Sequence, residues 1–422
     1  MSAVRVAALQ LAAHNRTDFS ATWPAIVARI RDAAQLGASL IVLPEGTLPA
    51  YVLADADFST SEIAGQIEQL QELCQALSTV VVAGAARRGP DGTFNSALVI
   101  DSDGSLAGTY DKHFLWDFDR LWFAPGTSIE PIATSLGPLG VMICADGRIP
   151  TIARWLVDRG AVALVMPTAW VTSGRDPEHL ENVQADLMAR VRARENGVPF
   201  IAANKVGTEL DCVAYCGKSQ VVRSDGSIAA LASQAQPQTI VADLDLRPPA
   251  RPRTAIANIV AVPAPHPSVR IALSAIPQAS WSNAQERAIA ADAWIDRTTM
   301  SANLRDRAVR IGDAEMQDPG YLPECRLAGY DLAIWDTTLE PPWQSLFAGC
   351  RALELRMYVV VADEREETLH AIDPDGAVVC GTFGTYKIAR FTLMPERIAN
   401  TFVASGTDIL EGLRRARAAS VS

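Results

Sequence analysis

The sequence predicts an α/β protein with a mixed β-sheet. Short apolar runs rich in Val, Ile and Leu alternate with longer stretches of helical periodicity through the first two thirds of the chain. The turn sequence Asp101-Ser102-Asp103-Gly104 between two further apolar runs is typical of an antiparallel hairpin. With 422 residues the chain is long enough for two domains, since domains usually contain about 100–200 residues.

The predicted elements follow in a regular order along the chain. We expect strands at Val4–Leu11, Leu40–Leu43, Val80–Ala86, Asn95–Ile100, Leu106–Tyr110, Val141–Cys144, Ala163–Met166 and Phe200–Asn204. We expect helices at Thr22–Leu36, Ser61–Leu77, Thr151–Asp158 and Glu178–Asn196. Pro150 and Gly160 bracket the third helix, because Pro is favoured at the first helical position and Gly just after the last.

Composition excludes several classes of protein. The formal net charge of −11 argues against nucleic acid or an anionic membrane as the main partner. Nowhere do about 18 apolar residues run together, as a membrane-spanning helix requires. The 7 cysteines are irregularly spaced, which suits a reducing compartment, and we predict a cytoplasmic protein. Cys212 and Cys216 have no nearby His to complete a metal site, so we predict neither metal nor cofactor.

A proline-rich stretch divides the chain. Leu246–Ser268 contains six prolines, more than one packed element tolerates, so the predicted domains are residues 1–260 and 261–422.

The second predicted domain repeats parts of the first in the same order. Val269–Leu273 restates Val4–Ala8, Leu327–Leu339 parallels Leu36–Leu48, and Arg351–Glu354 with Tyr358–Asp363 matches Arg192–Glu195 with Pro199–Asn204. The repeat predicts a truncated second copy in which Asp336 takes the place of Glu45. The stretch that would correspond to residues 50–185 is missing, so this copy is predicted to be non-catalytic.

Three polar residues follow predicted strands of the first domain. Glu45 comes after Leu40–Leu43, Lys112 after the hairpin strand, and Cys144 at the turn between a strand and a helix. A thiol at a helix N-terminus lies near backbone N–H groups that lower its pKa and can stabilise an oxyanion. Each residue taken singly is more often explained by packing, capping or a solvated surface charge.

Together, these residues resemble the catalytic set of the nitrilase superfamily of carbon-nitrogen hydrolases. The resemblance covers about residues 3–260 and rests on five blocks: Leu43-Pro44-Glu45, Tyr110–Leu115 with Phe123–Gly126, Ile143–Pro150, Pro167–Trp170, and Arg192–Asn196 with Ala202–Asn204. It implies a four-layer α-β-β-α sandwich.

The resemblance also implies a role for each site residue. Glu45 would be the general base, Cys144 the nucleophile, and Lys112 with the N–H of Ala145 the oxyanion site. Asp119 stands where many relatives carry a second Glu. It and Trp170 are predicted to bind substrate.

Alternatives remain open within this prediction. The string Cys-x-Asp-Gly resembles aliphatic amidases, which favours a small linear amide over a nitrile, and an N-carbamoyl amide is a further option. A non-catalytic binding or regulatory scaffold is the competing hypothesis. Loops Val52–Ser59 and Val171–Glu178 are expected to set pocket specificity. Family members dimerise, so we predict a homo-oligomer, or a second copy that serves as an intramolecular pseudo-partner or shapes the mouth of the pocket.

Overall fold

The chain forms two compact units in a computed structural model that describes residues 3–53, 58–172, 179–249, 259–282 and 289–420. The first unit comprises Met1–Pro252 with the short pieces Ala404–Thr407 and Arg415–Ser422, and the second comprises Arg253–Val403 with Asp408–Arg414. Within the described ranges, no helix combines the length and apolar character needed to cross a membrane. Part of the proline-rich stretch, residues 250–258, lies outside the described residues.

The larger sheet of the first unit has eight strands in the order β10-β9-β1-β2-β3-β4-β5, with β13 also paired to β1. Its strands are β1 (Val4–Ala12), β2 (Leu40–Val42), β3 (Val80–Gly89), β4 (Gly92–Ile100), β5 (Leu106–Asp111), β9 (Lys205–Glu209), β10 (Val213–Cys216) and β13 (Gln238–Leu244). Neighbours β1, β2 and β3 are parallel, whereas β3, β4 and β5 are antiparallel. The mixed sheet predicted from the sequence is confirmed.

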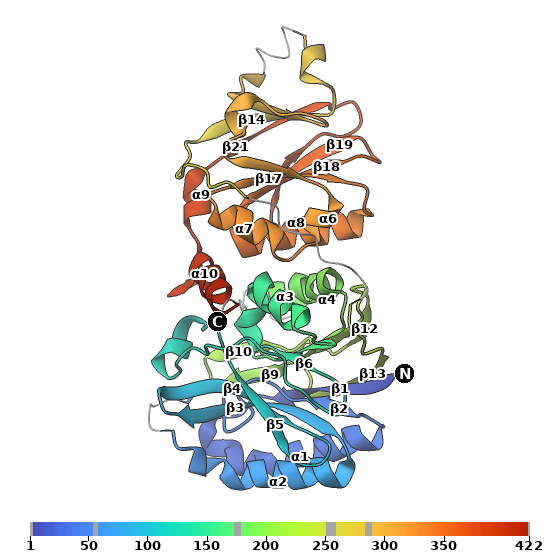
Figure 1. Ribbon diagram of the computed structural model, residues 1–422, viewed down its shortest axis with the longest axis vertical. Coiled ribbons are helices and arrows are strands. Elements are labelled where there is room, and N and C mark those ends of the chain that lie inside the picture. Colours follow the sequence, from blue (N-terminus) through green and yellow to red (C-terminus); the bar gives the residue numbers. More distant parts are fainter. Residues whose placement is uncertain (1–2, 54–57, 173–178, 250–258, 283–288, 421–422) are drawn as a thin grey trace. The chain divides into compact units, whose positions relative to one another are not determined.

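The second sheet has five strands in the order β12-β11-β8-β7-β6. These are β6 (Leu139–Val141), β7 (Ala163–Pro167), β8 (Phe200–Ala203), β11 (Gln220–Val222) and β12 (Ile228–Leu231). Helices α1 (Phe19–Gln35) and α2 (Ala64–Leu77) cover the larger sheet, and α3 (Pro150–Asp158) and α4 (Ala189–Asn196) lie over the smaller one (Figure 1). The first unit is therefore layered helix, sheet, sheet, helix, as the resemblance implies.

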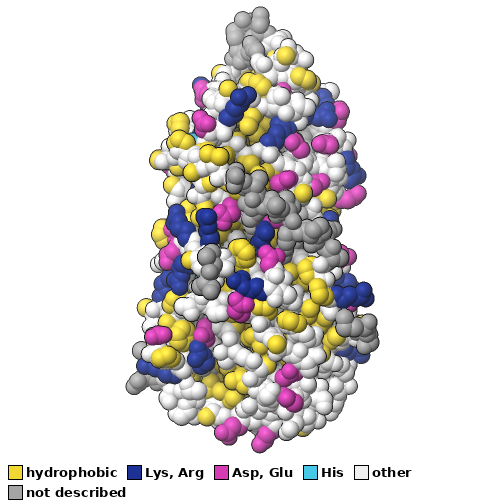
Figure 2. Space-filling model, viewed as in Figure 1, with side chains coloured by type: hydrophobic (Ala, Val, Ile, Leu, Met, Phe, Trp, Pro, Cys, Tyr) yellow, Lys and Arg dark blue, Asp and Glu magenta, His cyan; other side chains and the backbone are white. Residues whose placement is uncertain are grey.

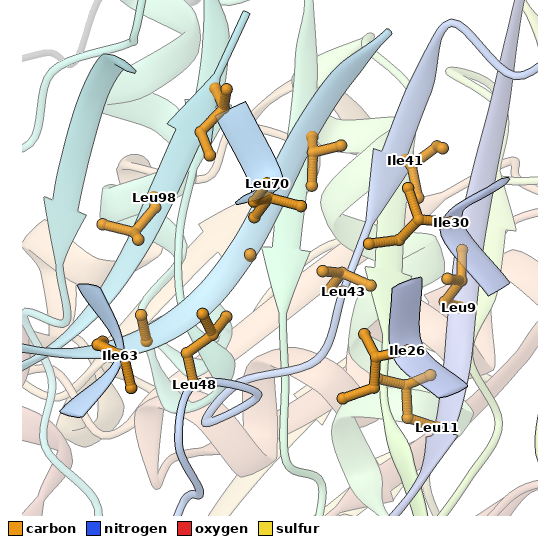
Figure 3. Close-up of a cluster of buried hydrophobic side chains, with 14 of the residues drawn as sticks. Leu9, Leu11, Ile26, Ile30, Ile41, Leu43, Leu48, Ile63, Leu70 and Leu98 are labelled. Atoms are coloured by element: carbon orange, nitrogen blue, oxygen red, sulfur yellow. The ribbon is translucent and has the colours of Figure 1, made fainter. Parts of the chain in front are cut away.

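The two faces of β1 show why the layers stack in this order. Ala7, Leu9 and Leu11 point into the hydrophobic cluster beneath α1 and α2, because side chains two apart share one face of a strand (Figure 3). Gln10 points the other way and is fully buried, where its side chain bonds to Ser219 and to the Ser233 carbonyl. Gln10, which interrupts the apolar run of β1 in the sequence, thus links this strand to the segments that contain Ser219 and Ser233.

Several predicted elements begin or end at other residues, and two of these differences bear on the site. The helix expected over Glu178–Asn196 is described from Gln184, where a π-helical turn (η5, Gln184–Met188) leads into α4. Strand β6 ends at Val141, so Cys144 is not its last residue. Instead, Cys144 opens a short 3₁₀ helix, η4 (Cys144–Arg148), and a second 3₁₀ helix, η3 (Asp117–Leu121), follows Lys112.

The second unit contains two smaller sheets, ordered β15-β14-β21 and β16-β17-β18-β19-β20. The residues of a two-stranded pair, β22 (Phe402–Ala404) and β23 (Thr407–Asp408), are divided between the two units. The remaining strands are β14 (Val269–Ser274), β15 (Ala293–Asp296), β16 (Ala308–Ile311), β17 (Leu332–Thr337), β18 (Tyr358–Asp363), β19 (Thr368–Ile372), β20 (Val378–Gly381) and β21 (Ile388–Leu393). The helices are α6 (Asp313–Met316), α7 (Tyr321–Leu327), α8 (Pro341–Leu355) and α9 (Pro395–Ala399), and α10 (Ile409–Ala419) begins in the second unit and ends in the first.

Strand pairing in the second unit parallels part of the first. Strand β14 is parallel to β15 and antiparallel to β21, just as β1 is parallel to β2 and antiparallel to β13. The order β16-β17-β18-β19-β20 has two parallel and then two antiparallel pairings, as does β6-β7-β8-β11-β12. The last pairing of each five-stranded sheet carries a register shift.

Candidate active site

Loops at the ends of three strands of the first unit bring Glu45, Lys112 and Cys144 together. Glu45 lies in the turn after β2, Lys112 directly follows β5, and Cys144 follows β6 on the second sheet. The turn after Glu45 is tight: Gly46 has φ +56°, and a Cβ there would lie 2.3 Å from the Tyr51 Cα. Only glycine fits this position, which turns the chain sharply beside the carboxylate.

Lys112 forms the centre of the cluster. Its Nζ lies 2.7 Å from Glu45 Oε1 and 2.6 Å from Asp119 Oδ2, and all three side chains are fully buried. Burial alone lowers the pKa of a lysine, but the charges of Asp119 and Glu45 outweigh it and hold the pKa of Lys112 well above its usual range. Lys112 is therefore a permanent ammonium, suited to binding a developing negative charge.

Cys144 sits in a strained turn beside this ammonium. Its φ of +44° is uncommon for a residue with a side chain, and such strain clusters at functional sites. Burial and the Glu45 carboxylate raise the pKa of the thiol to about 12, although Lys112, the Thr168 hydroxyl and the Ala169 N–H favour the thiolate. The resting thiol is therefore protonated and needs a base before it can attack.

Glu45 is placed to be that base. Burial raises the pKa of this carboxyl, and the Lys112 charge and a 2.7 Å hydrogen bond from Asn95 Nδ2 to Oε1 pull it down again. Its second oxygen, Oε2, is buried without a hydrogen-bond partner among the described residues. One carboxylate oxygen thus holds Lys112, and the other remains to accept a proton.

Several residues that hold the site were missed in the sequence. Asn95 belongs to β4, and Tyr51, whose hydroxyl donates to Asp119 Oδ1 at 2.8 Å, lies in the loop after Gly46. The backbone N–H of Trp116 donates to Asp119 Oδ2 at 2.8 Å. Asp119 therefore positions the lysine and is itself held from two sides.

Asp146 ties the loop of Lys112 to the loop of Cys144. Its carboxylate accepts from the backbone N–H groups of His113, Phe114 and Ile143 and from the Tyr110 hydroxyl, at 2.7–3.1 Å. Burial outweighs these bonds and raises its pKa to about 6. The only sequence signal was its place two residues after the candidate nucleophile.

Ala145 and Trp170 are both buried in this region. Trp170 follows Ala169, and its indole Nε1 is buried without a partner in the described part of the chain. Its backbone is fixed by Asn204, whose side chain bonds to both the N–H and the carbonyl of Trp170. Residues 54–57 and 173–178 of the two loops predicted to set specificity lie outside the described residues.

The described residues contain no cluster of three His, Cys, Asp or Glu side chains that could hold a metal ion. Basic and acidic side chains are interspersed over the face shown in Figure 2.

Comparison with known proteins identifies the family of the chain. The model of the carbon-nitrogen hydrolase family matches residues 5–248. The chain belongs to this family. The carbon-nitrogen hydrolases act on bonds other than peptide bonds, and the first unit of this chain is such a hydrolase domain of the nitrilase superfamily.

The region that matches individual relatives spans most of the length of those proteins. A probable nitrilase of Schizosaccharomyces pombe is 31% identical over 196 residues, 45% of this chain and 69% of that protein. N-carbamoylputrescine amidase of Arabidopsis thaliana is 29% identical over 265 residues, 58% of this chain and 87% of that protein. A crystal structure of a carbon-nitrogen hydrolase from Helicobacter pylori is similar with a TM-score of 0.51 at 29% identity, covering 58% of this chain and 90% of that one.

Proposed function

We propose that the first unit hydrolyses the carbon-nitrogen bond of a small linear amide through a thioester on Cys144, releasing ammonia or a small amine. The observation that carries this proposal is the fully buried Lys112 ammonium, held between Glu45 and Asp119 and electrostatically coupled to the Cys144 thiol. Burying three charged side chains is unfavourable for stability. These charges are placed where they can assist acyl transfer to the Cys144 thiol.

The first half-reaction transfers the acyl group to sulfur. Glu45 Oε2 takes the thiol proton, and Cys144 Sγ attacks the amide carbon. The carbonyl oxygen becomes an oxyanion that Lys112 Nζ and the Ala145 N–H stabilise. Glu45 then gives its proton to the amide nitrogen, the carbon-nitrogen bond breaks, and ammonia or amine leaves.

The second half-reaction returns the enzyme to its starting state. Glu45, again a carboxylate, takes a proton from water while the water oxygen attacks the thioester carbon. The carbon-sulfur bond breaks, the acid leaves, and the proton held by Glu45 returns to the Cys144 thiolate. The cycle consumes one amide and one water and needs no other reactant.

A screen for ammonia release over a panel of amides tests this function. Cys144→Ala, which removes the nucleophile, is the control and should release none. Ammonia together with carbon dioxide would point to a carbamoyl amide, and turnover of nitriles alone would point to a nitrilase. No turnover of any compound by the intact protein would favour the non-catalytic scaffold.

The second unit, we propose, is a partial copy of the first. The parallel strand orders support this, as does a buried ion pair: Arg351 with Glu354 on α8 repeats Arg192 with Glu195 on α4, each three residues apart and each placed before the third parallel strand. Arg192 donates to the Gly147 carbonyl, and Arg351 to the Met316 carbonyl. An experimental structure would test this proposal, because the second unit should then superpose on the part of the first unit that contains the sheet β6-β7-β8-β11-β12.

This correspondence changes which residues are equivalent. It makes β17 the counterpart of β7, in place of the predicted match of Asp336 with Glu45. If Met316 takes the place of Gly147, then Asp313, three residues earlier, takes the place of Cys144. Asp313 accepts hydrogen bonds from Trp335 and Thr337 and begins α6. The copy would thus retain the framework around the nucleophile while lacking the thiol.

A further inference from the structure

The C-terminal end of the chain contributes residues to the first unit. Ala404–Thr407 and Arg415–Ser422 belong to this unit, although the carbon-nitrogen hydrolase family matches only residues 5–248. Between these two pieces, Asp408–Arg414 belongs to the second unit. The family match therefore assigns no role to the C-terminal pieces, and their role has to be inferred from their contacts.

Thr407 is bonded to the loop that follows Lys112. Its side chain is fully buried, and its hydroxyl accepts a 2.7 Å hydrogen bond from the backbone N–H of Asp117. The same hydroxyl donates to the Ser405 carbonyl at 3.3 Å, so its hydrogen points away from Asp117. Asp117 is the first residue of η3, and the first N–H groups of a helix have no acceptor within it. Thr407 therefore supplies the acceptor that the start of η3 requires.

Asp117 adopts a backbone conformation that needs such support. Its φ is +36°, in the left-handed region that residues with a side chain rarely adopt. A strained backbone persists only where the surrounding structure holds it in place. The hydrogen bond to Thr407 provides this constraint at the residue where the chain turns into η3.

The turn formed by η3 carries Asp119 to Lys112. The backbone N–H of Asp119 donates to the Trp116 carbonyl at 2.7 Å, and its Oδ2 accepts from the Trp116 N–H at 2.8 Å. The same Oδ2 lies 2.6 Å from Lys112 Nζ. Asp117 lies inside this closed turn, so a shift of its backbone would move the carboxylate that positions the lysine.

Two further contacts attach the last C-terminal piece to the first unit. Arg159, which directly follows α3, donates to the Ser420 carbonyl at 3.0 Å. His113, which directly follows Lys112, is buried and interacts with Arg415: burial and the charge of this arginine lower the pKa of the imidazole. The C-terminal pieces therefore act on the loop after Lys112 at two residues, His113 and Asp117.

We propose that Thr407 is a positioning residue for Lys112, so that the active site is incomplete without the C-terminal end of the chain. This inference rests on the proposed hydrolysis at Cys144, in which Lys112 binds the oxyanion. Without the Thr407 hydroxyl, the start of η3 would relax, and Asp119 would no longer hold the ammonium where the oxyanion forms. Because this charge develops only in the transition state, the loss should fall on kcat and not on KM.

Substitutions that differ only by a hydroxyl test this role. Thr407→Val keeps the branched shape and removes the acceptor, so kcat for ammonia release should fall about 10–100-fold, as a misplacement of about 1 Å can cause. KM should stay near the wild-type value. Thr407→Ser keeps the acceptor and should have a kcat close to that of the wild type. Thr407→Ala and Thr407→Ser form a second pair, which gives the same contrast if Thr407→Val fails to fold.

Thr382→Val is the matched control. Thr382 is also buried, and its hydroxyl accepts from the backbone N–H of Leu369 at 2.9 Å, but both residues belong to the second unit. This variant should keep the wild-type kcat. A wild-type kcat in Thr407→Val, an equal loss in Thr407→Ser, an equal loss in Thr382→Val, or a change confined to KM would each overturn the proposal.

Hydrogen exchange separates this inference from the proposed hydrolysis, because it needs no substrate. Mass spectrometry of peptides that cover residues 113–121 should show faster exchange in Thr407→Val than in the wild type, and no change in Thr382→Val. Faster exchange in a protein that hydrolyses no amide would refute the hydrolysis and support the positioning of η3 by Thr407. Unchanged exchange in a protein that hydrolyses amides would refute the role of Thr407 alone.

Discussion

Two buried lysine clusters lie in the first unit, and their difference shows what distinguishes chemistry from structure. Lys112 and Lys205 are both fully buried, each bonds to a glutamate, and each lies near a tyrosine ring, Tyr51 at 5.7 Å and Tyr215 at 5.4 Å. Each tyrosine hydroxyl also donates to a carboxylate of its cluster, at 2.8 Å.

The clusters differ in what remains unsatisfied. Both oxygens of Glu209 are used: Oε1 accepts from the Val52 N–H at 2.6 Å, and Oε2 accepts from Lys205 and Tyr215. Lys205 also donates to the Gly46 carbonyl and so holds the turn that carries Glu45. In the Lys112 cluster, Glu45 Oε2 has no partner among the described residues, and a thiol lies nearby. The Lys205 cluster, in which both glutamate oxygens have partners, supports the fold. The Lys112 cluster, in which one glutamate oxygen has no partner among the described residues, is available to react.

Replacing each glutamate by glutamine separates the two clusters most strongly. Glu45→Gln removes the proposed base and should lower kcat by about 100–10,000-fold, because general acid-base catalysis contributes that much. Glu209→Gln should act chiefly on stability, since both of its oxygens hold the fold. Steady-state ammonia release gives kcat, and denaturant unfolding gives the stability, of both variants. Equal losses of kcat in the two variants would contradict the distinction between a catalytic and a structural cluster.

Breaking the Lys205 cluster should strongly lower the stability of the protein. Lys205→Met leaves Glu209 buried without its cation, and the free energy of unfolding should fall by about 3–5 kcal/mol. The double variant Lys205→Met/Glu209→Met should recover part of this loss, because it buries no unpaired charge. Urea unfolding curves give both values, and a single variant as stable as the wild type would contradict the structural role.

The raised pKa of Cys144, about 12, predicts an unusual pH profile for alkylation. The thiolate is the reactive form, so below this pKa the rate of reaction with iodoacetamide should rise about tenfold per pH unit from pH 7 to 10. Mass spectrometry of the peptide that contains Cys144 follows the rate. A plateau beginning near pH 8.5 would mean an ordinary thiol.

The smallest expected effect is a shift in the pH dependence of turnover. Glu45 must be ionised to act, so kcat/KM should fall as the pH drops through its raised pKa. Asn95→Ala removes a hydrogen bond that favours the carboxylate, so the pKa should rise further and the acid limb should move up by about 0.7 pH unit for about 1 kcal/mol. An acid limb that stays in place would remove Asn95 from the account.

The sequence identified the ends of strands and helix starts better than the contacts between them. Glu45, Lys112 and Cys144 stood out because each follows an apolar run, and the structure brings them together. Asn95 could not be found this way, because it lies inside a strand and reaches Glu45 only once β4 has paired with its neighbours.

The predicted repeat shows a different limit. Short parallel strands have similar apolar sequences, so Leu332–Thr337 matched the run before Glu45 by sequence. Strand order and the Arg351–Glu354 pair instead support a match with β7. Pairing partners are long-range information that local patterns do not contain.

The acyl-thioester on Cys144 is the central claim, and acid quenching followed by intact-mass measurement tests it most directly. Protein mixed with an excess of a hydrolysed amide and quenched during turnover should carry one added acyl group, located on Cys144 by peptide mapping and absent from Cys144→Ala. Ammonia release by Cys144→Ala at the wild-type rate, or an adduct on another residue, would contradict the account.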